Sequence, residues 1–327
     1  IVRIKETRKG FVFFVVSCFF LLYNKIDFIA SKCKRGKMRN YLNDYQVLSC
    51  STLEDALCIM QEKPDSIPLA GGTDLMVYLK YNRLVAGRYL NLHSIPELQP
   101  KIDIQENQIV FSALTTYRDV RMNPYFKDNM KLLPLVASNI GAMSIQNIGT
   151  WVGNIGNASP AADGVLALML YDAKVHLKSQ QGERVILLAD FYKGYKQMDR
   201  DSHELITAIS IPKSAKSAYE YYRKVGERKL QAIAKIAYGI RMYINKDKTV
   251  QDSRIVFGSM MPYTYRCRSL ETLLQGKKIT PDVIQQGVEI IQQELQPIDD
   301  IRSTARYRLQ VAKNLWKESL ESLTNLS

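Results

Sequence analysis

Two glycine-rich segments carry the residues whose types and spacing point to ligand chemistry. The first, Ala70-Gly71-Gly72-Thr73-Asp74, follows a short apolar stretch that predicts a strand. Two adjacent glycines permit positive φ, and successive backbone N–H groups in such a turn form a concave site for an anion. Thr73 adds a hydroxyl that can reach a phosphate oxygen, and Asp74 is expected to hold the turn. A purely structural turn explains this first segment equally well.

The second segment is longer and has more polar groups. Three glycines between positions 149 and 156 alternate with Thr150, Asn154 and Asn157, whose side chains can bond phosphate or ribose. Ser159-Pro160 then predicts a helix start, because serine is a good N-cap and proline suits the first helical position. That helix N-terminus would favour a diphosphate, and Asp163 could accept hydrogen bonds from ribose hydroxyls. The alternative is a glycine-rich crossover that only packs tightly.

Two such segments, separated by a β-rich stretch, indicate a dinucleotide held across a crevice. Neither contains G-x-G-x-x-G or G-x-x-x-x-G-K-[ST], which disfavours a Rossmann site and a P-loop. The five cysteines share no C-x-x-C spacing, and none of the three histidines has another ligand type at a metal spacing. We therefore expect no metal site, reduced thiols as in a cytoplasmic protein, and chemistry supplied by a bound cofactor.

The net charge of +13 is concentrated at the start of the chain. Residues 1–37 hold nine Lys and Arg against two acidic residues, which leaves an excess of only six over the rest of the chain. Such a mild excess predicts an ordinary solvated surface, and no basic stripe interleaved with aromatic residues indicates a nucleic-acid site. We expect neither nucleic acid nor a membrane as a partner.

An apolar run of thirteen residues, Phe11–Tyr23, lies within this basic leader. It is shorter than the roughly 20 residues that a membrane-spanning helix needs. Its length and basic flank suit a signal peptide, but no good cleavage site follows. The chain starts with Ile, and Arg35-Gly36-Lys37 before Met38 is compatible with the purine-rich codons that precede a bacterial start. We expect residues 1–37 to be a non-native leader and the natural product to begin at Met38.

Hydrophobic periodicity and the positions of glycine and proline predict alternating strands and helices, hence an α+β protein of two or three domains. Ser51 is expected to cap the first helix. Further helices are expected at 132–140, at 164–171, and from 270 and 304 onward. Strands are expected at 45–48, 67–70, 88–92, 109–111, 173–177, 184–187, 204–211, 219–225, 231–244 and 253–259.

In the order of its motifs, the chain resembles the FAD-binding (medium) subunit of the xanthine dehydrogenase, carbon monoxide dehydrogenase and nicotinate dehydrogenase family of molybdenum hydroxylases. The matching segments are AGGTDL (70–75), NIGTWVGNIGNASPAAD (147–163), LITAISIP (205–212), YRKVGERKLQAIAK (222–235) and DDIRSTARYR (299–308). The resemblance covers essentially the whole chain after Met38. It implies the vanillyl-alcohol-oxidase-type (PCMH-type) FAD-binding fold, with subdomains at 38–98 and 99–213 and a C-terminal α+β domain at 214–327.

The resemblance also implies non-covalent FAD and a set of cofactor-binding residues. Ile206 is expected against the isoalloxazine ring and Lys224 near the flavin, although an ordinary strand residue and a surface charge would be simpler interpretations without the resemblance. The two pyrophosphate loops and the ribose side comprise Leu69, Ala70, Gly71, Gly72, Thr73, Asp74, Leu75, Thr150, Gly153, Asn154, Asn157, Ser159 and Asp163.

The sequence departs from the family within the second segment. Relatives usually read Thr-Ile-Gly-Gly-Asn where this chain has Thr150-Trp151-Val152-Gly153-Asn154. Valine resists positive φ, so the loop must be rearranged if the family's first glycine needs that conformation, and Gly156 is expected to return the lost freedom. No cysteine lies between Cys58 and Cys267, so the extra iron–sulfur cluster of some relatives is not expected.

The implied function is electron transfer within a heterotrimer. Substrate is hydroxylated at molybdopterin in a large subunit, and electrons pass through two [2Fe–2S] clusters in a small subunit to the FAD. They leave as hydride to NAD⁺ or singly to another carrier. This step requires no side-chain acid or base, so no catalytic residue is predicted. The alternatives are a stand-alone FAD-dependent oxidase or reductase of the same fold and, in another class, a non-redox nucleotide-binding module.

Overall fold

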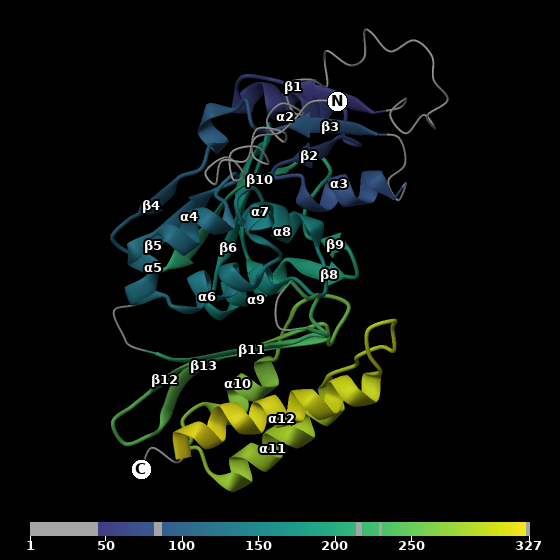
Figure 1. Ribbon diagram of the computed structural model, residues 1–327. Coiled ribbons are helices and arrows are strands. Elements are labelled where there is room, and N and C mark those ends of the chain that lie inside the picture. Colours follow the sequence, from purple (N-terminus) through teal and green to yellow (C-terminus); the bar gives the residue numbers. More distant parts are fainter. Residues whose placement is uncertain (1–44, 82–86, 214–217, 229–230, 325–327) are drawn as a thin grey trace, which may run out of the picture. The chain divides into compact units, whose positions relative to one another are not determined.

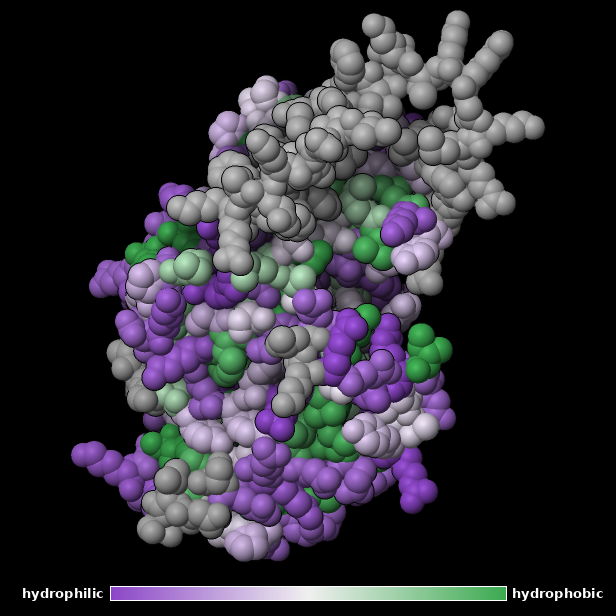
Figure 2. Space-filling model, viewed as in Figure 1, coloured by the Kyte–Doolittle hydropathy of each residue, from purple (hydrophilic) through white to green (hydrophobic). Residues whose placement is uncertain are grey.

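The computed structural model describes residues 45–81, 87–213, 218–228 and 231–324 (Figure 1). All of these residues fall within one unit, Asp44–Ser327. The expectations for the basic leader, for the apolar run Phe11–Tyr23 and for a start at Met38 lie outside the described residues. None of the helices in the described part combines the length and the apolar character that a membrane span needs. On the face shown in Figure 2, hydrophilic residues predominate and hydrophobic ones form small separate groups.

A three-stranded parallel sheet in the order β1-β3-β2 forms the first part of the described chain. Thr52 caps its first helix, because Thr52 Oγ1 accepts a hydrogen bond from Asp55 N at 3.1 Å. The predicted cap, Ser51, was therefore wrong by one residue. The elements are β1 (Gln46–Ser49), α2 (Leu53–Glu62), β2 (Ile67–Leu69), α3 (Thr73–Lys80) and β3 (Arg88–Asn91).

A five-stranded antiparallel sheet follows, in the order β4-β5-β10-β6-β7. Its central strand β10 pairs with β5 and β6 and buries Ile209 and Ile211 completely. The strands are β4 (Ile102–Ile104), β5 (Gln108–Ser112), β6 (Lys174–Ser179), β7 (Gly182–Leu187) and β10 (Leu205–Pro212).

Short helices and one small hairpin accompany this sheet (Figure 1). The α-helices are α4 (Tyr117–Met122), α5 (Pro124–Asn129), α6 (Leu132–Asn139), α7 (Met143–Gln146), α8 (Trp151–Asn157) and α9 (Asp163–Leu170). Two 3₁₀ turns span Pro96–Leu98 and Leu188–Asp190, and the hairpin is formed by β8 (Tyr192–Gly194) and β9 (Gln197–Met198). Helix α9 is buried along its whole length, which makes it the centre of this part of the core.

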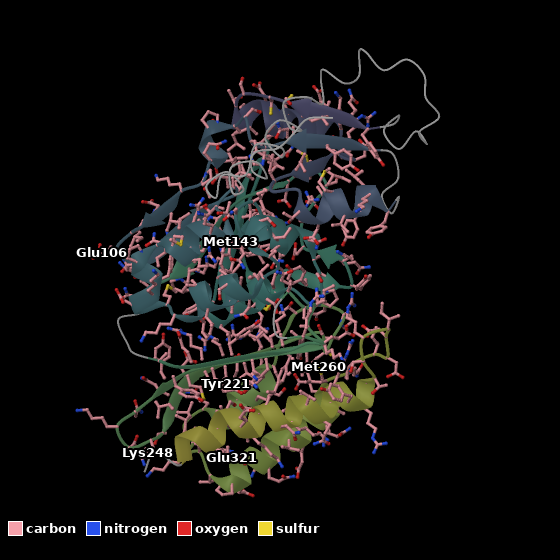
Figure 3. All side chains as sticks on the ribbon, in the orientation of Figure 1. Glu106, Met143, Tyr221, Lys248, Met260 and Glu321 are labelled. Atoms are coloured by element: carbon pink, nitrogen blue, oxygen red, sulfur yellow. The ribbon has the colours of Figure 1, made fainter. Side chains whose placement is uncertain are left out.

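A four-stranded antiparallel sheet, β11-β12-β13-β14, packs between α9 and three C-terminal helices. A Cβ on Gly239 would lie 2.6 Å from Leu170 Cδ1, so the sheet lies tightly against α9. On the opposite face, Tyr221 and Met260 point toward the helices (Figure 3). The elements are β11 (Tyr219–Val225), β12 (Ile236–Ile244), β13 (Val250–Gly258), β14 (Tyr265–Arg266), α10 (Arg268–Leu274), α11 (Pro281–Glu294) and α12 (Ala305–Thr324).

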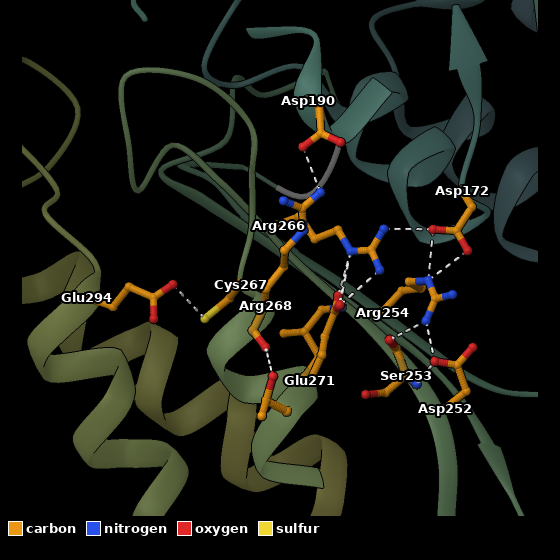
Figure 4. Close-up of polar contacts among 12 residues, drawn as sticks. Asp172, Asp190, Asp252, Ser253, Arg254, Arg266, Cys267, Arg268, Glu271 and Glu294 are labelled. Carbon is orange, nitrogen blue, oxygen red and sulfur yellow. Dashed lines mark hydrogen bonds and ion pairs between the residues drawn. The ribbon is translucent and has the colours of Figure 1, made fainter. Parts of the chain in front are cut away.

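Ion pairs join this C-terminal sheet to the residues that follow α9 and β7 (Figure 4). Asp172 accepts hydrogen bonds from Arg254 Nε and Arg266 Nη1, both at 2.7 Å. Arg268 Nη2 donates to Asp190 at 2.6 Å. The arginines come from β13, β14 and α10, so three elements of the C-terminal part are tied to the part that contains the five-stranded sheet.

The α+β class predicted from the sequence is confirmed, and most predicted elements recur with small shifts of their ends. The strand expected at 231–244 begins only at Ile236. The larger difference is at residues 149–157, expected as a loop, where the structure has helix α8.

Candidate functional site

A cleft of about 430 Å³ brings the two glycine segments together. Its walls come from β2 and α3, from α8, from the β8–β9 hairpin and from the start of β10. Its volume is within the range of small-ligand sites, about 300–1,000 Å³. Eleven of the fifteen predicted site residues line it, namely Ala70, Gly71, Gly72, Thr73, Asp74, Leu75, Thr150, Gly153, Asn154, Asn157 and Ile206.

Both glycines of the first segment stand where a side chain would be strained or would clash. Gly72 has a φ of 68° and begins α3 without a side-chain cap, so backbone N–H groups of the first helical turn keep their hydrogens for a ligand. A Cβ on Gly71 would lie 2.1 Å from the carbonyl oxygen of Ile148. The two segments therefore meet backbone to backbone at Gly71. Desolvation raises the pKa of Asp74, and the Lys196 ammonium opposes this shift.

The second glycine segment is helix α8 rather than the expected loop. Thr150 is its N-cap, and Thr150 Oγ1 accepts a hydrogen bond from Gly153 N at 2.9 Å. No proline lies within Trp151–Asn157, and glycines at negative φ can enter a helix at a modest cost. Thr150 thus uses its acceptor oxygen for capping and can still donate its hydroxyl proton.

The departure at Trp151-Val152 leaves the backbone unstrained, because both residues have helical geometry in α8. Trp151 is completely buried and packs against Tyr117 and Phe111, with ring centroids 5.2 and 6.2 Å apart. Gly156 needs no positive φ either. The expected return of backbone freedom at Gly156 was therefore wrong, because Val152 does not adopt the conformation that would require it.

Asn154, not Ser159, serves the N-terminus of α9. Asn154 Oδ1 accepts a hydrogen bond from Val165 N at 3.2 Å, within the first turn of α9. The helix begins at Asp163, so the predicted start at Ser159-Pro160 was wrong. Ser159 Oγ instead accepts from Ala161 N at 3.3 Å in a local turn. Ser159 does not line the cleft, and neither does Leu69.

Asp163 and Lys224 form a buried ion pair beside the cleft rather than within its wall. Lys224 Nζ donates to Asp163 Oδ2 at 2.6 Å and to the carbonyl oxygen of Asn139 at 3.2 Å. Tyr222 OH donates to Asp163 Oδ1 at 3.1 Å. Burial raises the pKa of Asp163, while Lys224 and Tyr222 act in the opposite direction. The pair thus joins α9 to β11.

Residues 43–214 match the FAD binding domain in molybdopterin dehydrogenase, and residues 220–323 match the CO dehydrogenase flavoprotein C-terminal domain. The first match alone covers more than half of the chain. The chain belongs to this family of FAD-binding molybdopterin dehydrogenase subunits. The fold is thus that of the FAD-binding oxidoreductase subunits which the sequence resembled.

The chain aligns with individual relatives along nearly their whole length, which is consistent with this membership. The chain is 28% identical over 286 residues to the glyceraldehyde dehydrogenase medium chain of Sulfolobus acidocaldarius, covering 86% of this chain and 99% of that protein. It is 26% identical over 283 residues to the nicotinate dehydrogenase FAD-subunit of Eubacterium barkeri, covering 85% and 95%. A solved chain of carbon monoxide dehydrogenase from Hydrogenophaga pseudoflava has the same fold, with a TM-score of 0.80 at 23% identity over 85% and 96%.

The residues that line the cleft fit the chemistry of FAD. A Cβ on Gly156 would meet nothing within 4 Å, so this glycine leaves open space in the wall of the cleft. Lys196 and Arg200 supply positive charge, and the start of α3 supplies backbone N–H groups. Ile206 and Met198 add apolar surface suited to an aromatic ring. Within the described residues, no group of three or more His, Cys, Asp or Glu is arranged to hold a metal.

Several residues of the cleft escaped prediction from the sequence. Tyr78, Lys196 and Arg200 all line it, the first from α3 and the others from the β8–β9 hairpin and the residues that follow. Tyr78 lies one turn beyond the first glycine segment, and that spacing could have indicated it. The lysine and arginine carried no local signal, because they reach the cleft only through the fold.

A buried carboxylate in the lining of the cleft, Glu204, makes stability depend on pH. Arg184 binds Glu204 through Nε at 2.6 Å and Nη2 at 2.7 Å, and this contact lowers the pKa of Glu204. A lowered folded-state pKa stabilises the protein above the unfolded value of about 4.3, and the contribution disappears as pH falls through the folded value. We expect Glu204→Gln to unfold at a lower temperature than the wild type at pH 7, with a difference that shrinks below about pH 4.

Thermal unfolding followed between pH 7 and acid measures this difference. Glu183→Gln is the matched control, because Glu183 also pairs with a cation, Lys178 at 2.6 Å, but its side chain is 66% exposed. Water screens such a pair, so its removal should matter little at any pH. A Glu204→Gln difference that stays constant with pH would contradict the assignment.

Proposed function

We propose that this chain takes electrons from [2Fe–2S] clusters of a small partner subunit and passes them through FAD to NAD⁺. The substrate would be hydroxylated at a molybdopterin centre in a large subunit. The supporting observation is that two consecutive family matches, 43–214 and 220–323, cover most of the chain while a single cleft unites both glycine segments. The odd number of cysteines, five without a C-x-x-C spacing, favours a cytoplasmic complex.

Each wall of the cleft has a proposed task. The start of α3, with Gly71 and Gly72, would hold the diphosphate, and Asn157 would donate to an oxygen of the cofactor. Ile206 would lie against the isoalloxazine ring. FAD, when bound, supplies the redox chemistry, and this chain's residues bind it, orient it and exclude water. Asp163 remains a proposed ribose partner, although in this structure its carboxylate is engaged by Lys224 and Tyr222.

We also propose that the working parts follow the boundaries 38–98, 99–213 and 214–327. The three main sheets support this division, since each is built from strands of a single part. The cleft lies between the first two parts. In this division the C-terminal part contributes Lys224, which reaches the N-terminal end of α9 through Asp163.

Titration with FAD tests whether the chain binds this cofactor, on which the rest of the proposal depends. We expect the purified full chain to bind FAD non-covalently with about one cofactor per chain, to turn yellow and to release the cofactor on acid denaturation. Absorbance after desalting measures this. A chain that stays colourless after incubation with FAD would contradict the assignment of the cleft.

Purification of the native complex tests the partners and the electron acceptor. Metal analysis and peptide identification should find molybdenum, iron and two further subunits with this chain. Anaerobic addition of NADH should bleach the flavin if NAD⁺ is the acceptor. A yellow chain that copurifies with neither metal nor further subunits would instead favour a stand-alone flavoprotein.

A further inference from the structure

Lys196 lies at the tip of the β8–β9 hairpin, next to the end of α8. The hairpin pairs Gly194 with Gln197, and Lys196 adopts a left-handed φ of 58°. Residues other than glycine seldom adopt this conformation, so surrounding contacts must hold it in place. Those contacts are with α3 and α8, two helices that both line the cleft.

Both hydrogen bonds of Lys196 go to a single residue, Asn157. Lys196 Nζ donates to the backbone carbonyl of Asn157 and to Asn157 Oδ1, the latter at 3.1 Å. Tyr78 OH donates to the same Oδ1 at 3.3 Å, and the Lys196 ammonium lies 5.8 Å from the centre of the Tyr78 ring. Because Asn157 is the last residue of α8, its carbonyl has no partner within the helix. Lys196 therefore donates to the free backbone carbonyl at the end of α8 and also fixes the orientation of the Asn157 side-chain amide.

We propose that Lys196 and Tyr78 are positioning residues that fix the Asn157 amide with its nitrogen available to FAD. The amide oxygen accepts from two donors, so both of its lone pairs are used. Among the described residues no side chain or carbonyl accepts from Nδ2, so its two N–H groups remain to serve the cleft, which Asn157 lines. A reversed amide would present its carbonyl oxygen to a ligand rich in phosphate and sugar oxygens, and two acceptors repel. The inference rests on the proposed function, since FAD is the ligand.

Lys196 could instead strengthen FAD binding only through the long-range attraction of its charge, and this effect would differ in its dependence on Asn157 and on salt. An ammonium that only attracts the diphosphate would act whether or not Asn157 is present, and salt would weaken its effect. An ammonium that holds the Asn157 amide would lose its influence once that amide is removed. The two possibilities are therefore separated by a double-mutant cycle rather than by a single substitution.

The experiment measures FAD dissociation constants of the full chain for wild type, Lys196→Met, Asn157→Ala and the double variant. We expect Lys196→Met and Asn157→Ala each to weaken binding about tenfold, and the double variant to bind no more weakly than Asn157→Ala. Lys196→Arg should keep most of the affinity, because its guanidinium can donate to the same oxygens. Tyr78→Phe leaves the hairpin intact and should also lose its effect in the Asn157→Ala background.

Lys193→Met is the matched control, because Lys193 lies on the same hairpin but pairs with Asp199 at 3.1 Å. It should bind FAD as the wild type does. Wild-type affinity in Lys196→Met, or multiplying losses in the double variant, would overturn the positioning role while leaving the FAD site in place. Failure of the wild-type chain to bind FAD would instead reject the proposed function.

Discussion

Gly71→Ala is expected to weaken FAD binding on the order of a hundredfold and to lower the free energy of unfolding by about 3 kcal/mol. The added methyl carbon would lie 2.1 Å from the carbonyl oxygen of Ile148 and 2.8 Å from its carbonyl carbon. These are backbone atoms, so no side-chain rotation can relieve the overlap. The two glycine segments would have to separate, and the cleft depends on their contact. Flavin titration and chemical denaturation of the full chain measure the two effects.

Gly156→Ala is the matched control for folding. Gly156 lies inside α8, and a Cβ there meets nothing within 4 Å. Because alanine is the better helix former by up to about 1 kcal/mol, this variant should unfold at the wild-type denaturant concentration or above it. If Gly71→Ala were as stable as Gly156→Ala and bound FAD like the wild type, the backbone contact between the segments would have no role.

Local signals in the sequence predicted the parts of the site that depend on backbone geometry. Adjacent glycines at 71 and 72 indicated a turn with positive φ, and Gly72 has φ 68°. The spacing of polar residues in the second segment predicted that Thr150, Asn154 and Asn157 share one binding site. All three line the cleft. The resemblance to a known family then supplied Ile206, which periodicity alone would have treated as an ordinary strand residue.

The remainder of the site depends on side-chain hydrogen bonds between distant segments, which local patterns do not encode. Ser159 is a good N-cap by composition, yet Asn154 serves α9 because α8 folds back against that helix end. Lys196 reaches Asn157 across 39 positions of the chain, and nothing near either residue indicates the contact. Without the resemblance, Lys224 would be taken for a surface charge, but its side chain is only 12% exposed because β11 packs against α6 and Lys224 bonds Asn139 and Asp163.

Asp163→Ala is expected to lower the free energy of unfolding of the FAD-free chain by about 3–5 kcal/mol. The loss of a ribose contact would not change this quantity, because no FAD is bound. The side chains of Asp163 and Lys224 are 8% and 12% exposed, and their charged atoms lie 2.6 Å apart. Removing the carboxylate would leave a buried ammonium without its partner. The double variant Asp163→Ala with Lys224→Met should regain more than half of the loss, since it removes both charges. Chemical denaturation without FAD measures the effect.

Asp65→Ala is the control for this pair, because Asp65 and Arg88 have side chains 62% and 41% exposed and the same separation of 2.6 Å. Its cost should stay below about 1 kcal/mol, since water screens exposed pairs. A loss of that size in Asp163→Ala would contradict the buried-pair argument. FAD affinity of the stabilised double variant then tests the pair as a cofactor contact. Affinity that stays low places Asp163 or Lys224 in contact with the cofactor, whereas restored affinity makes the pair a clamp between α9 and β11.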